Sequence, residues 1–490
     1  MPQFKRRAVA SSFIFRFPGN DLSEKPQVAL FRRSDKVRTY QNKYGLIAGS
    51  VEASDASPLA TAWRELQEET TLTSKSLQLF RQGKPFTFSG RGDKEEEGGL
   101  GDDRIKLNWE HSGYKWFDLD EISGDESFEG VPRIMDSLRS VWFDIDLGSV
   151  AGKILSKGLT DLKEDRESGA RQLASKALSI YANVITNIDA SERNAWWKNA
   201  RLAAWHIWKN GREIMGAPIL NVLLSALQAI EKRLPPSGPP SASVVGDLCN
   251  AIKQVDQASE QSETETNEAF NSFLRHHFSA SDAIKILTLS SSSTVTSCLA
   301  HALTSQDQQI PPLDIRILES RPLFEGVQTA RRLASLTQAK EPKSNISIYT
   351  DASAAIASRD IDMVLIGADT IDRAGNVCNK TGSLPAILTA AHISPRAKTV
   401  VLSELDKMLP FDEPPAEEEN DVQEMTQNWN AVSEPAESLS GIGIKNVGFE
   451  WVDTQLIDHI ITERGNETLD GISQRAKEMS EKADCFFSDI

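Results

Sequence analysis

The spacing of apolar residues predicts two different textures along the chain. Before residue 147, short apolar runs such as 12–15 and 28–31 are separated by polar loops, which is typical of strands. Residues 58–70 predict a helix, because a proline stands in the first turn and apolar residues follow at helical spacing among charges. Residues 112–122 predict a closing strand and a turn. This first region is therefore expected to hold short strands around one helix.

A second texture begins near residue 148. Up to about 232 apolar residues recur at helical spacing, and 234–266 follows as a Pro-rich run and a polar stretch that predict a low-complexity linker. After residue 281, short β-branched runs alternate with helical patterns such as 324–336. That alternation predicts a doubly wound, mostly parallel sheet. The expected strands are 285–289, 314–319, 346–350, 363–366 and 399–402.

The length supports a multidomain α/β protein, because 490 residues exceed one ordinary hydrophobic core. We expect a first domain over 1–147, a helical subdomain over 148–280 and a Rossmann-like domain over 281–490. An acidic, disordered insertion is predicted within the last domain at about 411–440, where glutamates and prolines gather.

Charge and cysteine content narrow the partners. The net charge of −16 argues against direct nucleic-acid binding, because phosphate backbones are bound by clustered Lys and Arg. The apolar runs have the length of strands and fall short of the roughly 20 residues of a membrane-spanning helix. The four cysteines are scattered without a CxxC pair, which indicates a reducing compartment. We therefore expect a cytoplasmic protein, with the nucleus left open.

Three glutamates carry the first chemical signal. Glu65, Glu68 and Glu69 stand at i, i+3 and i+4, so they project from one face of the predicted helix. Like charges repel there unless a cation lies between them, and Mg²⁺ or Mn²⁺ prefers such oxygen ligands. Alone, three glutamates are more typical of a solvated acidic face.

The surrounding sequence favours a metal site. A glycine-containing loop over 45–52 leads to the helix, and a Trp- and Tyr-containing strand at 114–121 closes the region. Together these segments resemble the Nudix box, whose pattern is G-x5-E-x7-R-E-U-x-E-E-x-G-U with U apolar. The resemblance implies an α/β/α sandwich that hydrolyses a diphosphate, with Glu65, Glu68 and Glu69 as catalytic metal ligands for Mg²⁺ or Mn²⁺. It also implies that Arg64 is a structural partner of a helix glutamate.

The flank of the box departs from the pattern. Counting from Gly49 gives Asp55 as the first acid and one residue too many before Arg64, whereas counting back from Arg64 gives Ala56. Both registers stay open on the sequence. Thr71 stands where the box ends in glycine, and Asp102 or Asp103 is a further candidate ligand, although a solvated loop is the more typical role.

A second set of motifs follows the predicted parallel strands. Serines 290–292 form a hydroxyl-rich turn before a helix, where free N–H groups favour an anion. Gly-Ala-Asp ends at Asp369. In their order these motifs are similar to the family of the initiation factor 2B α, β and δ subunits, methylthioribose-1-phosphate isomerase and ribose-1,5-bisphosphate isomerase. The ligand-binding residues that the resemblance implies are Ser290, Ser291, Ser292, Arg321, Asn379 and Lys380.

The same resemblance argues against isomerase catalysis. Asp369 matches the aspartate of the isomerases' proton-transfer pair, but Ser290 stands at the position of their cysteine. A hydroxyl is a far poorer acid–base group than a thiol near neutrality. Met215 also replaces an arginine that contacts phosphate in the isomerases. The resemblance still implies binding of a sugar phosphate or nucleotide, and a homodimer.

Three functions stay open on the sequence. The favoured one is a Mg²⁺- or Mn²⁺-dependent hydrolase of a nucleoside-diphosphate-linked compound, fused to a domain that binds a phosphorylated metabolite. The second is a non-catalytic regulatory or scaffold protein of the translation-factor type. The third is a sugar-phosphate isomerase that uses serine.

Overall fold

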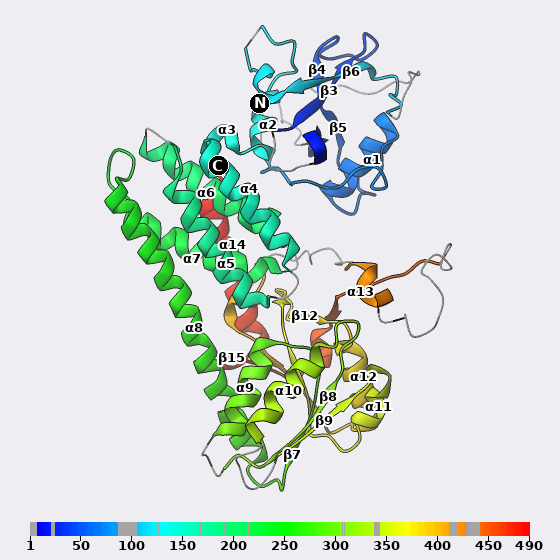
Figure 1. Cartoon of the computed structure of the whole chain (residues 1–490), viewed down its shortest axis with the longest axis vertical. Coiled ribbons are helices and arrows are strands. Elements are labelled where there is room, and N and C mark those ends of the chain that lie inside the picture. The colour runs from blue at the N-terminus through cyan, green and yellow to red at the C-terminus, as the bar shows by residue number, and fades with distance from the viewer. Residues whose placement is uncertain are drawn as a thin grey trace, which may run out of the picture. The chain divides into compact units, whose positions relative to one another are not determined.

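The protein is described here from a computed structural model (Figure 1). Contacts divide the chain into two compact units, Met1–Lys157 and Gly158–Ile490. The structure describes all residues except 1–6, 21–24, 87–104, 126, 166–167, 190–191, 213–214, 306, 308, 338–343, 411–419, 428 and 430–441.

The first unit is built on short antiparallel strands. In one sheet the central strand is β3, which pairs with β2, β4 and β6; in a second sheet β1 pairs with β5. The strands are β1 (Val9–Ser12), β2 (Ile14–Arg16), β3 (Gln27–Arg33), β4 (Tyr44–Gly45), β5 (Ile47–Ser50) and β6 (His111–Asp118). The helices are η1 (Pro18–Asn20), α1 (Pro58–Thr70), η2 (Leu119–Glu121), α2 (Ile134–Val141) and α3 (Asp144–Leu147).

Strand β3 shows why this unit is a sandwich. Successive side chains of a strand point to opposite faces of its sheet. Val28 and Leu30 therefore pack in one core with α2, while Ala29 and Phe31 pack in another with Leu66 of α1. One helix thus covers each face, as the Nudix resemblance implied.

The second unit begins with helices. Helix α4 (Ser149–Glu164) starts before the boundary between the units, and α5 (Ala170–Thr186), α6 (Arg193–Asn210) and α7 (Gly216–Glu231) follow. The long helix α8 (Ala242–Phe278) packs against α5 and α7 and also against β15 and β16, so it joins the helices to the large sheet (Figure 1).

Helix α8 corrects the predicted linker over 234–266. Only its Pro-rich beginning precedes the helix, which starts after Ser241 accepts a hydrogen bond from the N–H of Val244. The polar stretch is rich in Gln and Glu, which are good helix formers. Buried Leu248 and Phe270 near its two ends fix the helix against the unit.

A seven-stranded sheet forms the remainder of the second unit. Its order is β16-β15-β13-β10-β7-β8-β9, and all neighbours are parallel except β15 and β16. The chain therefore winds outward from β7 in one direction and from β10 in the other. The strands are β7 (Ile284–Thr288), β8 (Leu313–Leu318), β9 (Asn345–Tyr349), β10 (Met363–Gly367), β13 (Lys398–Leu402), β15 (His459–Thr462) and β16 (Gly465–Glu467).

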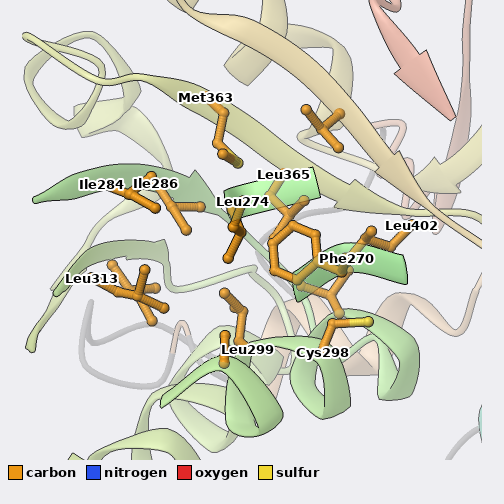
Figure 2. Close-up of a cluster of buried hydrophobic side chains, with 14 of the residues drawn as sticks. Phe270, Leu274, Ile284, Ile286, Cys298, Leu299, Leu313, Met363, Leu365 and Leu402 are labelled. Atoms are coloured by element: carbon orange, nitrogen blue, oxygen red, sulfur yellow. The ribbon is translucent and has the colours of Figure 1, made fainter. Parts of the chain in front are cut away.

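Helices cover both faces of this sheet. One core joins alternate residues of β7 and β10 to α8, α9 (Ser293–Thr304) and α10 (Glu325–Thr337); Figure 2 shows Phe270 and Leu274 beside Ile286 and Leu365. The other core joins the intervening residues to α11 (Ala354–Ala357), α12 (Ser383–Ile393) and α14 (Leu469–Phe487). The predicted doubly wound sheet is therefore confirmed.

Smaller elements complete the second unit. A three-stranded antiparallel sheet is formed by β11 (Thr370–Ile371), β12 (Val377–Lys380) and β14 (Phe449–Val452). Most of the predicted acidic insertion lies outside the described residues, apart from α13 (Val422–Thr426). Short helices are η4 (Asp351–Ser353), η5 (Leu405–Lys407) and η8 (Thr454–Leu456). In the part of the chain that the structure describes, no helix is long and apolar enough to cross a membrane.

Helix α14 returns to the helices of the same unit. The ring of Phe486 lies 6.1 Å from that of Trp197, and Phe487 stacks at 5.9 Å on Trp208. Arg201 donates a hydrogen bond of 3.2 Å to the carbonyl of Phe486. These buried aromatic pairs hold the end of the described chain in the helical core.

Candidate functional site

Helix α1 presents the three predicted glutamates. It begins where the side chain of Ser57 accepts a hydrogen bond of 3.2 Å from the N–H of Ala60, and Pro58 occupies its first position. It ends at Thr71, whose φ of 61° is left-handed. That backbone favours glycine, so the departure of Thr71 from the box places a β-branched residue where glycine is least strained.

The loop before α1 settles which residue is the first acid. Asp55 accepts hydrogen bonds from the Nε and Nη2 atoms of Arg64 at 3.1 and 3.0 Å, and one of 2.8 Å from Thr61. The bonds from Arg64 hold the pKa of Asp55 well below its usual range. The register that counts from Gly49 is therefore correct, and the extra residue is absorbed in the turn where Glu52 and Asp55 bond to each other.

Gly49 is required by the approach of Glu65. A Cβ at Gly49 would lie 1.8 Å from Oε1 of Glu65, so only glycine leaves room for this carboxylate. Glu65 also accepts a hydrogen bond of 2.7 Å from Nη1 of Arg64. The predicted pairing of Arg64 with a helix glutamate is present, and it extends to Asp55.

Glu69 lies in a buried corner with a histidine. Its Oε2 atom is 2.5 Å from Nε2 of His111 at the start of β6, and the two side chains are only 4% and 1% exposed. Burial, and next the charge of Glu65, raises the pKa of Glu69 to about 8. Burial likewise lowers the pKa of His111 to about 4. Both groups therefore favour their uncharged forms near neutrality.

Glu68 points to a different partner. Its side chain is 56% exposed and lies 3.3 Å from Nη1 of Arg64. Among the described residues no three His, Cys, Asp or Glu side chains converge as metal ligands, and Nη1 of Arg64 lies between the carboxylates of Glu65 and Glu68. Asp102 and Asp103 lie outside the described residues.

The chemistry of the α1 carboxylates nevertheless fits a divalent cation. Glu69 is a buried carboxyl whose pKa is raised by burial and next by the charge of Glu65, and the ion pair of Glu65 with Arg64 does not remove this repulsion. Glu68 stands on the same helix face, and its exposure leaves it free to change rotamer. The residues that would hold the cation are therefore Glu65, Glu68 and Glu69.

The motifs of the second unit meet at the switch point of its sheet. Ser290 follows β7 and Asp369 follows β10, which are neighbours in the sheet. After β7 the chain adds β8 and β9 on one side of the sheet, and after β10 it adds β13 and β15 on the other side. The switch point is the place between β7 and β10 where this direction reverses. Ligands of open α/β sheets bind outside the carboxyl ends of strands at such a point. A Cβ at Gly367 would lie 2.5 Å from Oγ of Ser292 and 3.6 Å from Oδ1 of Asn379, so these segments are in close contact.

The three serines differ in their surroundings. Ser290 is buried with φ of 65°; its N–H donates to Oγ of Ser320 at 2.7 Å, and its carbonyl accepts from Thr329 at 2.8 Å. Ser291 is exposed. Ser292 caps α9 by accepting from the N–H of Val295 at 3.4 Å. The turn is thus held by its backbone at the end of β7.

Asp369 lies half-buried among cations. Burial raises the pKa of Asp369, and the charges of Lys407, Arg212 and Lys380 oppose this shift. Lys380 is itself paired, at 3.0 Å, with Glu325. Of the residues proposed to bind a ligand, Asn379 and Lys380 are buried beside the switch point, whereas Arg321 is exposed and packs over the ring of Phe324.

A buried ion pair lies next to this site. Nζ of Lys407 is 2.8 Å from Glu404 and 3.0 Å from Oγ1 of Thr294 in the first turn of α9, and the Thr294 hydroxyl donates to Glu404 at 2.9 Å. Burial alone would raise the pKa of Glu404, but the charge of Lys407 and the hydrogen bonds from Lys407 and Thr294 together lower it. Burial, and next the charge of Glu404, raises the pKa of the neighbouring Asp406 to about 7.

Comparison with known families agrees with the two units. The model of the Initiation factor 2 subunit family matches residues 166–468, more than half of the 490-residue chain. The chain belongs to the initiation factor 2 subunit family. Ahead of the family region it carries a NUDIX domain, matched over residues 6–137.

Isomerases are among the relatives of this family member. It is 32% identical over 150 residues to the methylthioribose-1-phosphate isomerase of Desulforamulus reducens, which covers 30% of the chain and 41% of the relative. It is 29% identical over 157 residues to the ribose 1,5-bisphosphate isomerase of Archaeoglobus fulgidus, covering 31% and 45%. The chain thus spans less than half the length of these curated relatives.

Solved structures of the family are also similar. The translation initiation factor eIF-2B of Pyrococcus horikoshii covers 64% of the chain and 96% of its own length, with 20% identity and a TM-score of 0.45. The 5-methylthioribose 1-phosphate isomerase of the same organism covers 67% and 87%, with 15% identity and a TM-score of 0.47.

Two residues of this family member were missed by reasoning from sequence. His111 contacts Glu69 across 42 positions, and no local spacing signals such a pair. Lys407 stands at i+3 from Glu404, a spacing that does indicate an ion pair on one turn. The sequence did not show that the Lys407 pair is buried beside Asp369.

Proposed function

We propose that the NUDIX domain is a divalent-cation-dependent hydrolase of a nucleoside-diphosphate-linked compound or another diphosphate. The observation that carries this proposal is the buried carboxyl of Glu69, whose pKa the neighbouring Glu65 helps to raise. Two facing carboxyls with Glu68 on the same helix face are stabilised by Mg²⁺ or Mn²⁺.

In this proposal the glutamates bind the cation, whereas Arg64 and Ser57 hold the glutamates in place. A cation held by Glu65, Glu68 and Glu69 would lower the pKa of a bound water molecule and polarise the diphosphate. Arg64 fixes Glu65 against Gly49 and ties the helix to Asp55. Ser57 begins the helix so that Glu65, Glu68 and Glu69 share one face.

The test is product release from a panel of diphosphate compounds with Mg²⁺ or Mn²⁺. Glu68→Gln keeps the shape of the exposed side chain but removes its charge, so release should fall by more than the roughly 10- to 100-fold that loss of an outer partner costs. A chelator should abolish release. The matched control is Asp125→Asn, an exposed carboxyl remote in sequence from α1, which should keep full activity. Release that survives both Glu68→Gln and the chelator would sink the hydrolase.

For the second unit we propose ligand binding and dimerisation. The switch-point location of Asp369, Asn379 and Lys380 supports a sugar phosphate or nucleotide as ligand. Exposed Ile356 of α11, with Leu388 and Ile393 of α12, supports a homodimer, because α11 and α12 pack together and present apolar side chains to solvent.

Both parts of this proposal are open to measurement. Ribose phosphates and nucleoside monophosphates should raise the thermal unfolding temperature of the wild type, and Lys380→Met should remove that rise. Ile356→Asp should shift sedimentation from dimer to monomer, whereas Leu469→Asp, at an exposed apolar residue of α14, should not. A monomeric wild type would refute the dimer.

Isomerase activity is a second candidate, favoured by the isomerase relatives. It would require Asp369 and survive a chelator. Ser290 weighs against it, because its hydroxyl is buried and lacks the acidity of a thiol. Conversion of methylthioribose 1-phosphate that Asp369→Asn abolishes would establish it.

A further inference from the structure

His111 makes a side-chain contact that the three-glutamate description of the NUDIX site omits. It begins β6, whereas Glu69 lies in the last turn of α1, and Nε2 to Oε2 measures 2.5 Å. Both side chains are almost fully buried. The contact therefore joins two elements in a buried corner beside Glu65.

The segment that carries His111 is tied to the end of α1 by its backbone. The N–H of Asn108 donates to the carbonyl of Glu69 at 3.0 Å, and the N–H of Lys106 donates to that of Thr70 at 3.2 Å. A turn follows, in which the N–H of His111 donates a hydrogen bond of 3.4 Å to the carbonyl of Asn108. The imidazole thus has a fixed position relative to Glu69 before any ligand binds.

The ring is also held from the side. Phe31 of β3 lies 5.5 Å from the imidazole between ring centroids, and Nδ1 has no hydrogen-bond partner among the described residues. The bond to Glu69 is therefore the polar contact that the side chain of His111 makes there. A buried polar group of this kind is costly unless the bond it makes is useful.

We propose that His111 is a positioning residue that fixes the Glu69 carboxyl for the divalent cation, an inference that rests on the proposed hydrolase. Glu69 has three side-chain torsions, and its bond to His111, together with a hydrogen bond from the backbone of Ala48, holds the rotamer that faces Glu65. Glu68, which lacks such a partner in the corner, is the exposed ligand. Outer partners of this type orient metal ligands and tune their affinity.

The test is Mn²⁺ binding to the full chain by titration calorimetry, with thermal unfolding measured alongside. His111→Phe keeps a ring against Phe31 but removes the hydrogen bond, so Mn²⁺ affinity should fall roughly 10- to 100-fold. His111→Gln places an amide near the position of Nε2 and should restore most of the affinity. Phe31→Leu disturbs the same packing without touching the bond; it should lower the unfolding temperature and leave Mn²⁺ affinity unchanged.

The outcomes separate the inference from the function it rests on. Folded His111→Phe protein that binds Mn²⁺ like the wild type would overturn the positioning role, as would His111→Gln that binds as weakly as His111→Phe. Wild type whose Mn²⁺ binding does not depend on Glu68 would instead overturn the proposed hydrolase and this inference with it. Affinity lost in His111→Phe and recovered in His111→Gln supports both.

Discussion

At the end of α1 the Glu69 carboxyl is buried beside Glu65, whose arginine partner leaves the pKa of Glu69 raised, whereas at the switch point of the large sheet Lys380 and Lys407 each pair with a carboxylate. In the proposed function, the first arrangement would be relieved by a divalent cation from solution. The second is already neutralised inside the protein, so a ligand there must compete with internal ion pairs. The α1 cluster would favour a cationic ligand, whereas a ligand at the switch point would have to displace an ion pair that the protein already makes.

Breaking the internal pair should have the largest effect on stability. Lys407→Met leaves Glu404 buried and unpaired, so the free energy of unfolding should fall by about 3–5 kcal/mol. Scanning calorimetry of the second unit would measure it. The double variant Lys407→Met, Glu404→Leu should recover much of the loss, and Lys398→Met, which breaks an exposed pair with Asp458, should cost less than about 1 kcal/mol. If Lys407→Met and Lys398→Met lowered the free energy of unfolding equally, burial would not strengthen the Lys407–Glu404 pair.

Asp406 should give the second unit a pH dependence. Its folded pKa of about 7 lies above the ordinary 3.8, so the folded state keeps a proton that the unfolded state releases, and stability falls as pH rises from about 4 to 7. Asp406→Asn should remove this fall and stabilise the protein at pH 8 by up to about 4 kcal/mol. Denaturant unfolding at pH 4 and pH 8 measures it. If the free energy of unfolding depended on pH in the same way in the wild type and in Asp406→Asn, Asp406 would not be the source of the pH dependence.

Gly49→Ala tests the first site without breaking the fold. The added Cβ meets only the end of the Glu65 side chain, which can move aside, so unfolding should change little. Displacing Glu65 by about 1 Å should lower diphosphate hydrolysis roughly 100-fold. Gly113→Ala is the matched control, because nothing lies within 4 Å of its added Cβ. A fully active Gly49→Ala variant would show that the position of Glu65 does not matter.

Thr71→Gly should have the smallest effect. Glycine adopts the left-handed backbone at the end of α1 with less strain, so the first unit should gain about 0.5–1 kcal/mol. Gln67→Gly, on an exposed turn of the same helix, should lose about 1 kcal/mol. Thermal unfolding of both variants measures these two changes in stability. A lower free energy of unfolding in Thr71→Gly would mean that the threonine side chain stabilises the end of the helix.

Local features of the sequence predicted local structure well. Helix α1 has the predicted bounds, because its proline, its spacing and its glutamates all act within a few residues. Strands β7, β8, β9, β10 and β13 of the large sheet lie within a residue or so of their predicted ranges, since buried parallel strands form short β-branched runs, whereas β15 and β16 were not predicted. The loop register, by contrast, depended on Arg64 reaching back to Asp55, which spacing alone left undecided.

Tertiary contacts account for what the sequence left out. His111 and Lys407 act through partners whose burial is decided by the packing of separate elements. The composition of 234–266, a Pro-rich run and then a polar stretch low in aromatic residues, predicts a linker, yet Leu248 and Phe270 anchor one continuous helix. Short-range patterns cannot report such anchoring.

The return of α14 to the helical core sets a practical limit on how the protein can be dissected. A cut near residue 280 would leave Trp197 and Trp208 without Phe486 and Phe487, and Arg201 without its carbonyl partner. The freed helices would expose an aromatic surface that favours aggregation. Deletion studies of the second unit should therefore keep both ends of 158–490 together, since they are sequence-distant halves of one cooperative core.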